Sequence, residues 1–373
     1  TTRLAANVSS TGNQSYAGAM TLGSDATLLA SAANAVINTG STINSDSTAR
    51  ALTVNASGAN GSAVFSGALG NTAALASLNT SASAIALNGS TVNTTGNQSY
   101  TGLVTLGADT TLSASGANAV ITTNNAVNSD STARALTVNA SGANGSAVVN
   151  AALGNNNALA SLNLTAANIG LNGSSVNTTG NQTYAGAVTL GADTALTGNN
   201  VITTSGSTVA GAGFSMNVTG NANLGGDVTN VSSVNVSGTT RLAANVSSTG
   251  NQSYAGAMTL GSDATVSASG TNAVITTNGP VDSDSTARAL TVNASGANGS
   301  AVFNGALGNT NALTTLNVSA SAIALNGSSV NTTGNQTYSG AVTLGADTAL
   351  TGNNVITTSG STVAGAGYSM NVT

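Results

Sequence analysis

Side chains able to do chemistry are few in this 373-residue chain. It contains no His, Cys, Lys or Glu, so its five basic residues are all Arg and its ten acidic residues are all Asp. The usual general bases, nucleophile activators and metal ligands are therefore missing. Glycoside hydrolysis needs two carboxylates beside one bond, and the close carboxylates here are Asp282 and Asp284, on a turn near Pro280 in a single repeat. We expect no catalytic activity.

One Asp recurs in the turn Leu-Gly-Ala/Ser-Asp, and a functional interpretation is calcium ligation. Calcium takes about six to eight oxygens, usually from several carboxylates, whereas each turn supplies one Asp. The Gly-Gly-x-Gly-x-Asp nonapeptide of calcium-binding β-rolls is also absent. The sequence favours a turn Asp that accepts a hydrogen bond from its own backbone, and it predicts no cofactor. The weak calcium candidates are Asp25, Asp109, Asp193, Asp263 and Asp347.

Asp and Arg recur at a fixed spacing in the motif Asp-Ser-Thr-Ala-Arg. A carboxylate and a guanidinium at constant separation could form a binding site. The structural alternative is an ion pair across a turn that fixes the start of the following Leu-Thr-Val strand, and such exposed pairs contribute only about 0–1 kcal/mol. We favour this structural pairing for Asp46 with Arg50, Asp130 with Arg134, and Asp284 with Arg288.

A Tyr recurs in the motif Gly-Asn-Gln-Ser/Thr-Tyr and could offer a stacking platform for sugars. Successive copies are about four coils apart if the chain forms stacked coils, which is too far for one groove. A packing or strand-edge role is the favoured interpretation for Tyr16, Tyr100, Tyr184, Tyr254 and Tyr338.

These motifs belong to a long internal repeat. The segment Gly-Asn-Gln-x-Tyr-x-Gly-x-x-Thr-Leu-Gly-x-Asp begins at Gly12, Gly96, Gly180, Gly250 and Gly334. Of the four intervals between successive starting positions, three have the same length, and the interval from Gly180 to Gly250 is shorter. Such self-similarity is typical of repeat architectures. We expect one continuous window of a longer array, with repeat units at 1–11 (tail), 12–95, 96–179, 180–249, 250–333 and 334–373 (head).

Short alternating runs inside each unit predict β-strands. In Arg50–Ser57, Leu52, Val54 and Ala56 share one face, while Thr and Asn occupy the other. The alternation changes parity at Ser81–Ser83, which predicts a bend. Units of unequal length fit an open solenoid better than a closed propeller. The predicted fold class is all-β, a parallel β-helix with about 20 residues per coil, as such coils commonly have.

The segments GNQTYAGAVTLGADTAL, ARALTVNASG and ALGNTAALASLN followed by SVNTTGNQTY resemble the β-strand repeats of large bacterial exoproteins of the filamentous-haemagglutinin type. The resemblance covers nearly all of the chain. It implies a right-handed parallel β-helix, export by a two-partner or autotransporter route, and a secreted or outer-surface location in a Gram-negative bacterium. It also implies a shaft that acts in adhesion or in a biofilm matrix.

Three functions remain open. The first is an extracellular structural shaft. The second is a self-assembling sheath, surface-layer or fibril subunit that contacts copies of itself end to end or laterally, because open strand edges favour stacking. The third is a Thr/Ser/Asn face that binds ice or glycans, although the Thr-x-Thr pattern breaks several times per unit. The net charge of −5 is small and dispersed, and no segment is long and apolar, so we expect neither nucleic-acid binding nor membrane insertion.

Overall fold

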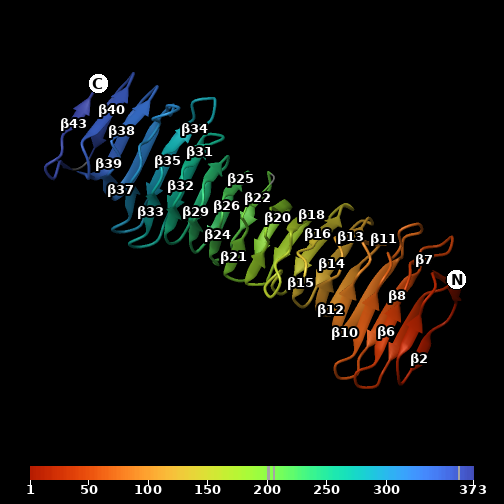
Figure 1. The fold of residues 1–373 in the computed structure, drawn as a ribbon. Coiled ribbons are helices and arrows are strands. Elements are labelled where there is room, and N and C mark those ends of the chain that lie inside the picture. Colours follow the sequence, from red (N-terminus) through yellow and green to blue (C-terminus); the bar gives the residue numbers. More distant parts are fainter. Residues whose placement is uncertain (200–201, 205, 360–361) are drawn as a thin grey trace. The chain divides into compact units, whose positions relative to one another are not determined.

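The computed structural model describes residues 1–199, 202–204, 206–359 and 362–373. It divides into two compact units, Thr1–Ala192 and Asp193–Thr373, which we call unit 1 and unit 2. The described residues form strands and turns and no helix (Figure 1). Among them no helix has the length and apolar character that a bilayer crossing requires.

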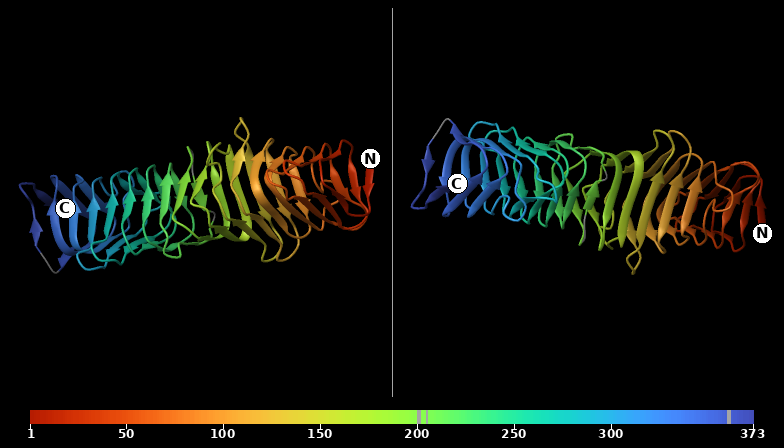
Figure 2. Two further views of the ribbon diagram at one scale, coloured as in Figure 1. Left: turned by 90° about the horizontal axis from the view of Figure 1, so that it is seen from below. Right: turned by 90° about the horizontal axis from the view of Figure 1, so that it is seen from above.

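Unit 1 is a stack of short parallel strands. Figure 2 shows that strands of successive coils lie side by side within this unit in both views. Its strands are β1 (Thr2–Leu4), β2 (Val8–Ser10), β3 (Gln14–Tyr16), β4 (Met20–Leu22), β5 (Ala26–Ala30), β6 (Val36–Thr39), β7 (Ile43–Ser45), β8 (Ala51–Ala56), β9 (Ser62–Phe65), β10 (Ser77–Leu87), β11 (Thr91–Thr94), β12 (Gln98–Leu106), β13 (Thr110–Ala114), β14 (Val120–Thr123), β15 (Val127–Ser129), β16 (Ala135–Ala140), β17 (Ser146–Val149), β18 (Ser161–Leu171), β19 (Ser175–Asn177) and β20 (Gln182–Leu190).

Unit 2 is built in the same way. Its strands are β21 (Thr194–Thr197), β22 (Ile202–Thr204), β23 (Val209–Ala210), β24 (Met216–Thr219), β25 (Ala222–Leu224), β26 (Val228–Val231), β27 (Val234–Val236), β28 (Thr240–Leu242), β29 (Val246–Ser248), β30 (Gln252–Tyr254), β31 (Met258–Leu260), β32 (Ala264–Ala268), β33 (Val274–Thr277), β34 (Val281–Ser283), β35 (Leu290–Ala294), β36 (Ser300–Phe303), β37 (Leu316–Leu325), β38 (Ser329–Thr332), β39 (Gln336–Leu344), β40 (Thr348–Gly352), β41 (Ile356–Ser359), β42 (Val363–Ala364) and β43 (Met370–Val372).

Each coil of unit 1 contributes a strand, or at Leu69 and Leu153 a single bridge residue, to each of three walls, which we call A, B and C and define by their inward columns. Wall A carries Gln14, Ile37, Ala63, Ile85, Val104, Val127, Leu153 and Val176. Wall B carries Met20, Ile43, Leu69, Val92, Leu112, Val138, Leu164 and Tyr184. Wall C carries Val8, Leu28, Val54, Thr80, Tyr100, Thr123, Val149, Leu171 and Leu190.

Unit 2 also has three walls, which we call D, E and F. Wall D carries Leu196, Val218, Val236, Tyr254, Thr277, Phe303, Leu325 and Leu344. Wall E carries Val209, Val228, Val246, Val266, Val292, Val318 and Tyr338. Wall F carries Ala222, Thr240, Met258, Val281, Leu307, Val330 and Leu350.

The predicted fold class is confirmed: the chain is an all-β parallel solenoid with about 16 turns of about 22 residues in its described part. Individual coils vary in length. The pairing of Thr2 with Met20 closes a short coil, whereas the pairing of Ile37 with Ala63 closes a longer one. The mean exceeds the expected value, because turns such as the one that carries Asp46 and Arg50 lengthen some coils.

The core is a narrow column of aliphatic side chains that alternate with outward polar ones. In β8, Leu52, Val54 and Ala56 are buried, and the residues between them are partly exposed. Burying a Val or Leu side chain contributes about 1.5–3 kcal/mol, and this gain is repeated in every coil. The expected bend near Ser81–Ser83 lies in β10, where two adjacent residues face outward and the register against β12 shifts between Ser81 and Ala84.

Candidate functional site

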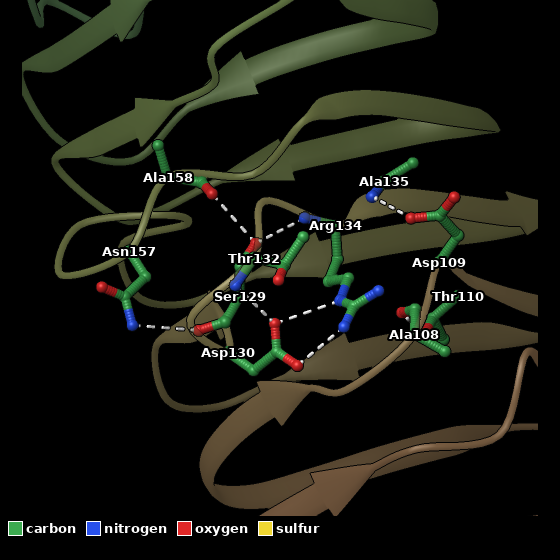
Figure 3. Close-up of polar contacts among 10 residues, drawn as sticks. All are labelled: Ala108, Asp109, Thr110, Ser129, Asp130, Thr132, Arg134, Ala135, Asn157 and Ala158. Atoms are coloured by element: carbon green, nitrogen blue, oxygen red, sulfur yellow. Dashed lines mark hydrogen bonds and ion pairs between the residues drawn. The ribbon is translucent and has the colours of Figure 1, made fainter.

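The Asp–Arg motif forms a compact corner in all three copies. Figure 3 shows the second copy, in the turn after β15. Arg134 Nε donates to Asp130 Oδ1 at 3.0 Å, and its Nη2 donates to Oδ2 at 2.9 Å. The Thr132 amide donates to the same Oδ1 at 2.8 Å. The bond from Arg134, followed by that from Thr132, lowers the pKa of the Asp130 carboxyl. The pairs Asp46 with Arg50 and Asp284 with Arg288 have the same geometry.

A buried Ser ties this corner to the next coil. Ser129 Oγ accepts a hydrogen bond from the Arg134 amide at 2.9 Å and donates to the Ala158 carbonyl at 2.9 Å. Asn157 Nδ2 donates to the Ser129 carbonyl at 3.2 Å (Figure 3). The corner thus fixes both the start of β16 and the loop of the following coil. Its geometry is that of a structural clamp.

The recurring turn Asp accepts a hydrogen bond from a backbone amide of the next coil, and not from its own turn as the sequence predicts. Asp109 Oδ1 accepts from the Ala135 amide at 2.9 Å, in the next coil and 26 residues later. Asp25 and Asp263 accept from Ala51 and Ala289 in the same way. Asp193 and Asp347 accept from the amide and hydroxyl of Ser215 and Ser369. The prediction that each Asp bonds the backbone of its own turn is wrong, because parallel stacking places an amide of the next coil beside the carboxylate.

The same five Asp are separated by whole repeat units, and each lies in a different turn. In the described part of the chain, no three His, Cys, Asp or Glu side chains come together. Calcium prefers several carboxylates, and these turns each offer one that is already accepting backbone hydrogen bonds. The donor set therefore does not fit a dedicated calcium site.

The recurring Tyr lies in the core and belongs to a polar network. Tyr100 is 0% exposed, so it offers no face for sugar stacking, and burial raises its pKa. Its hydroxyl donates to Gln98 Oε1 at 2.9 Å. Gln98 Nε2 donates to the carbonyls of Val92 at 3.1 Å and Ser113 at 2.8 Å, and to Thr94 Oγ1 at 3.2 Å. Tyr184, Tyr254 and Tyr338 are equally buried, whereas Tyr16 is half-buried.

The sequence interpretation overlooked the Gln of this network. The signal was present, since Gln98 and Tyr100 are two residues apart in an alternating strand and must point to the same side. Gln14, Gln182, Gln252 and Gln336 precede the other four Tyr at the same spacing, and all five Gln are buried. We call each Gln-x-Tyr pair with its acceptors a Gln–Tyr network.

Copies of a motif do not gather on one wall. Along wall A, four pairings lead from Gln14 to Val104, six residues past Gln98. Four full turns are therefore six residues longer than the repeat unit from Gly12 to Thr95. This repeat unit thus ends one wall before it completes its fourth turn. In unit 1, Tyr16 lies on wall A, Tyr100 on wall C and Tyr184 on wall B. In unit 2, Tyr254 lies on wall D and Tyr338 on wall E.

The outward surface is polar, and much of it is used in bonds between coils. Asn13, Asn97 and Asn251 each accept from a backbone amide 23 residues later. Asn304 donates to Asn278 and accepts from Asn326, both at 2.7 Å. A shallow depression in unit 1 is lined by Ala56, Ser57, Gly58, Ser81, Ala82, Ser83, Thr101, Gly102 and Asn125, none of them charged.

Regularity along a wall is limited. The outward column of wall C reads Thr27, Thr53, Asn79, Ser99, Thr122, Val148 and Gly170, so hydroxyl and amide groups give way to Val and Gly. The ice-binding form of the third candidate function requires an unbroken Thr column, and wall C lacks one. A scan of protein-family models and searches of curated proteins and of solved structures gave no match to this chain.

Proposed function

We propose that this chain is part of an extracellular structural shaft, either the stalk of a bacterial surface adhesin or a fibre of a biofilm matrix, and that it carries out no catalysis. The observation that carries the proposal is the use made of the recurring polar side chains. The Asp–Arg corners, the turn Asp and the Gln–Tyr networks all bond within or between coils. A shaft needs this kind of interaction many times over and needs no unique site.

The placement of the copies supports the same function. Because successive copies lie on different walls, repetition multiplies coil contacts without building one recognition face. The resemblance to exported filamentous-haemagglutinin-type repeats supports a location outside a Gram-negative cell. Its partners would be copies of itself or surface glycans that bind beyond these coils.

Immuno-electron microscopy of the source cells tests the location. An antibody raised against residues 96–179 should label filaments at the cell surface or in the extracellular matrix. Cells that lack the gene are the control. Labelling confined to the cell interior would contradict the proposal.

A glycan array probed with the purified chain tests the absence of a ligand face. A shaft should give signals no higher than a control protein of similar charge. Saturable binding to one class of glycan by this chain would overturn the shaft function in favour of a recognition surface.

A further inference from the structure

The apolar core alone leaves the register between coils weakly specified. Inward columns mix residues freely: on wall C, Leu28 pairs with Val54, Val54 with Thr80, and Thr80 with Tyr100. The same Leu-Thr-Val-Asn-Ala strand lies on wall C as β8 and on wall B as β16. A slip of two residues keeps every inward side chain inward, since the side-chain period of a strand is two. Near-identical units multiply the alternative stackings.

We propose that the Gln–Tyr network is a register determinant inside the solenoid core, in addition to the exposed Asp and Asn bonds between coils. The amide of Gln98 lies at the corner between walls B and C. It donates to Val92 and Thr94 of its own coil and to Ser113 of the next coil. All three bonds form only when the two coils have their native alignment. Gln98 and Tyr100 are each 0% exposed, and water cannot replace a lost partner.

The bond to the next coil recurs at a constant spacing. Gln14, Gln98, Gln252 and Gln336 each donate to the carbonyl 15 residues later, at 2.6–2.8 Å. This carbonyl belongs to Leu29, Ser113, Ser267 and Thr351, so its side chain varies while its position does not. The network therefore depends on the position of the backbone carbonyl and tolerates different side chains at that residue.

Slippage would leave the amide without its acceptor. Strand residues rise about 3.3 Å each, so a two-residue slip moves the Ser113 carbonyl about 6.6 Å from its place. An unpaired buried amide is strongly unfavourable, whereas an aliphatic side chain at the same position would accept either register. Buried polar groups can specify one arrangement among several in this way.

Disulfide trapping in this Cys-free chain tests the proposal. Thr91 and Thr111 are paired neighbours on the outer side of wall B, across the coil boundary that Gln98 spans, so Thr91→Cys with Thr111→Cys reports the native register. Thr91→Cys with Ser113→Cys, which leaves the Ser113 carbonyl in place, reports a two-residue slip at the same boundary. In the native register these two Cα atoms are about 8 Å apart, beyond the reach of a disulfide.

The networks are removed by replacing Gln with Leu and Tyr with Phe at all five copies. The matched control replaces the Leu of the following Thr-Leu-Gly, which is buried in every copy, with Ala: Leu22, Leu106, Leu190, Leu260 and Leu344. We expect the slipped cross-link to rise on the order of tenfold without the networks and to stay at background in the control, although the control lowers the melting temperature.

Two results would overturn the proposal: a slipped cross-link that stays at background in the folded network-free chain, or one that rises equally in the control. If the chain with all ten substitutions does not fold, the five Tyr→Phe changes alone provide the test. They leave each Gln Oε1 without its Tyr donor and should raise the slipped cross-link above that of the control. Circular dichroism confirms that each variant retains its strands.

Discussion

At the scale of single residues, the acidic side chains serve as acceptors for the fold. The Arg donors lower the pKa of Asp46, Asp130 and Asp284, and Ser donors lower that of Asp193 and Asp347. Their folded-state pKa values lie below the unfolded value of about 3.9, so the ionised form favours the folded state. This contribution is complete above the unfolded pKa and is lost as pH falls through the folded one.

We therefore expect the melting temperature to stay constant between pH 5 and 8 and to fall below about pH 4. The plateau follows because the chain has no His or Cys to titrate in that range. Thermal melts at closely spaced pH values measure this. The variant Asp46→Asn, Asp130→Asn, Asp284→Asn should show a shallower acid decline, and an equally steep decline would contradict the assignment.

The Tyr hydroxyl gives a second test at this scale. Tyr100→Phe should lower the free energy of unfolding by about 1–3 kcal/mol, because Gln98 Oε1 loses its donor inside the core. Tyr16→Phe is the matched control and should have a smaller effect, since Tyr16 is half-buried and water can replace its hydroxyl. Equal effects in urea titrations would show that burial does not decide the difference.

At the scale of strands, the bends depend on Gly. Gly102 has φ +147° opposite the register shift of β10, and a Cβ there would lie 1.9 Å from the Ala82 carbonyl oxygen. Gly186 and Gly340 occupy the same place opposite β18 and β37. The strand can turn from wall C to wall A because no side chain occupies this space.

Gly102→Ala should therefore destabilise the fold by more than about 1 kcal/mol. Gly12→Ala is the control, because a Cβ at Gly12 meets no atom within 4 Å. Chemical denaturation of both variants measures the difference. A neutral Gly102→Ala would mean that the bend can be made without Gly.

The strands and their inward faces could be predicted from the sequence, as β8 shows, because the period of two is local. The stacking partners could not. Asp109 bonds Ala135 and Gln98 bonds Ser113 because of the lengths of the coils between them. These lengths vary along the chain, and no local sequence pattern predicts them. The paired spacing of Asp130 and Arg134 was visible, whereas the buried Ser129 beneath it was not distinguished from the many surface Ser residues.

At the scale of the molecule, contacts run mainly between neighbouring coils, so stability should be a sum of local terms. Deleting residues 96–179 joins Thr95 to Gly180, which begins the same motif as Gly96. The shortened chain should fold with an unchanged β-sheet circular-dichroism signal per residue. Deleting 96–137 removes half of that unit and breaks the coil sequence at the junction, and this chain should fold poorly. Comparable folding of both would contradict coil-by-coil stacking.

The change of wall from one copy of the motif to the next also affects how neighbouring molecules can pack side by side. Two copies of unit 1 lying alongside each other could match one patch, but a repeat later that patch has turned to another side. Flat, continuous faces are what allow strand-rich proteins to bundle irreversibly. Because the motif lies on a different wall in each repeat of unit 1, we expect side-by-side contacts between shafts to be limited to short patches.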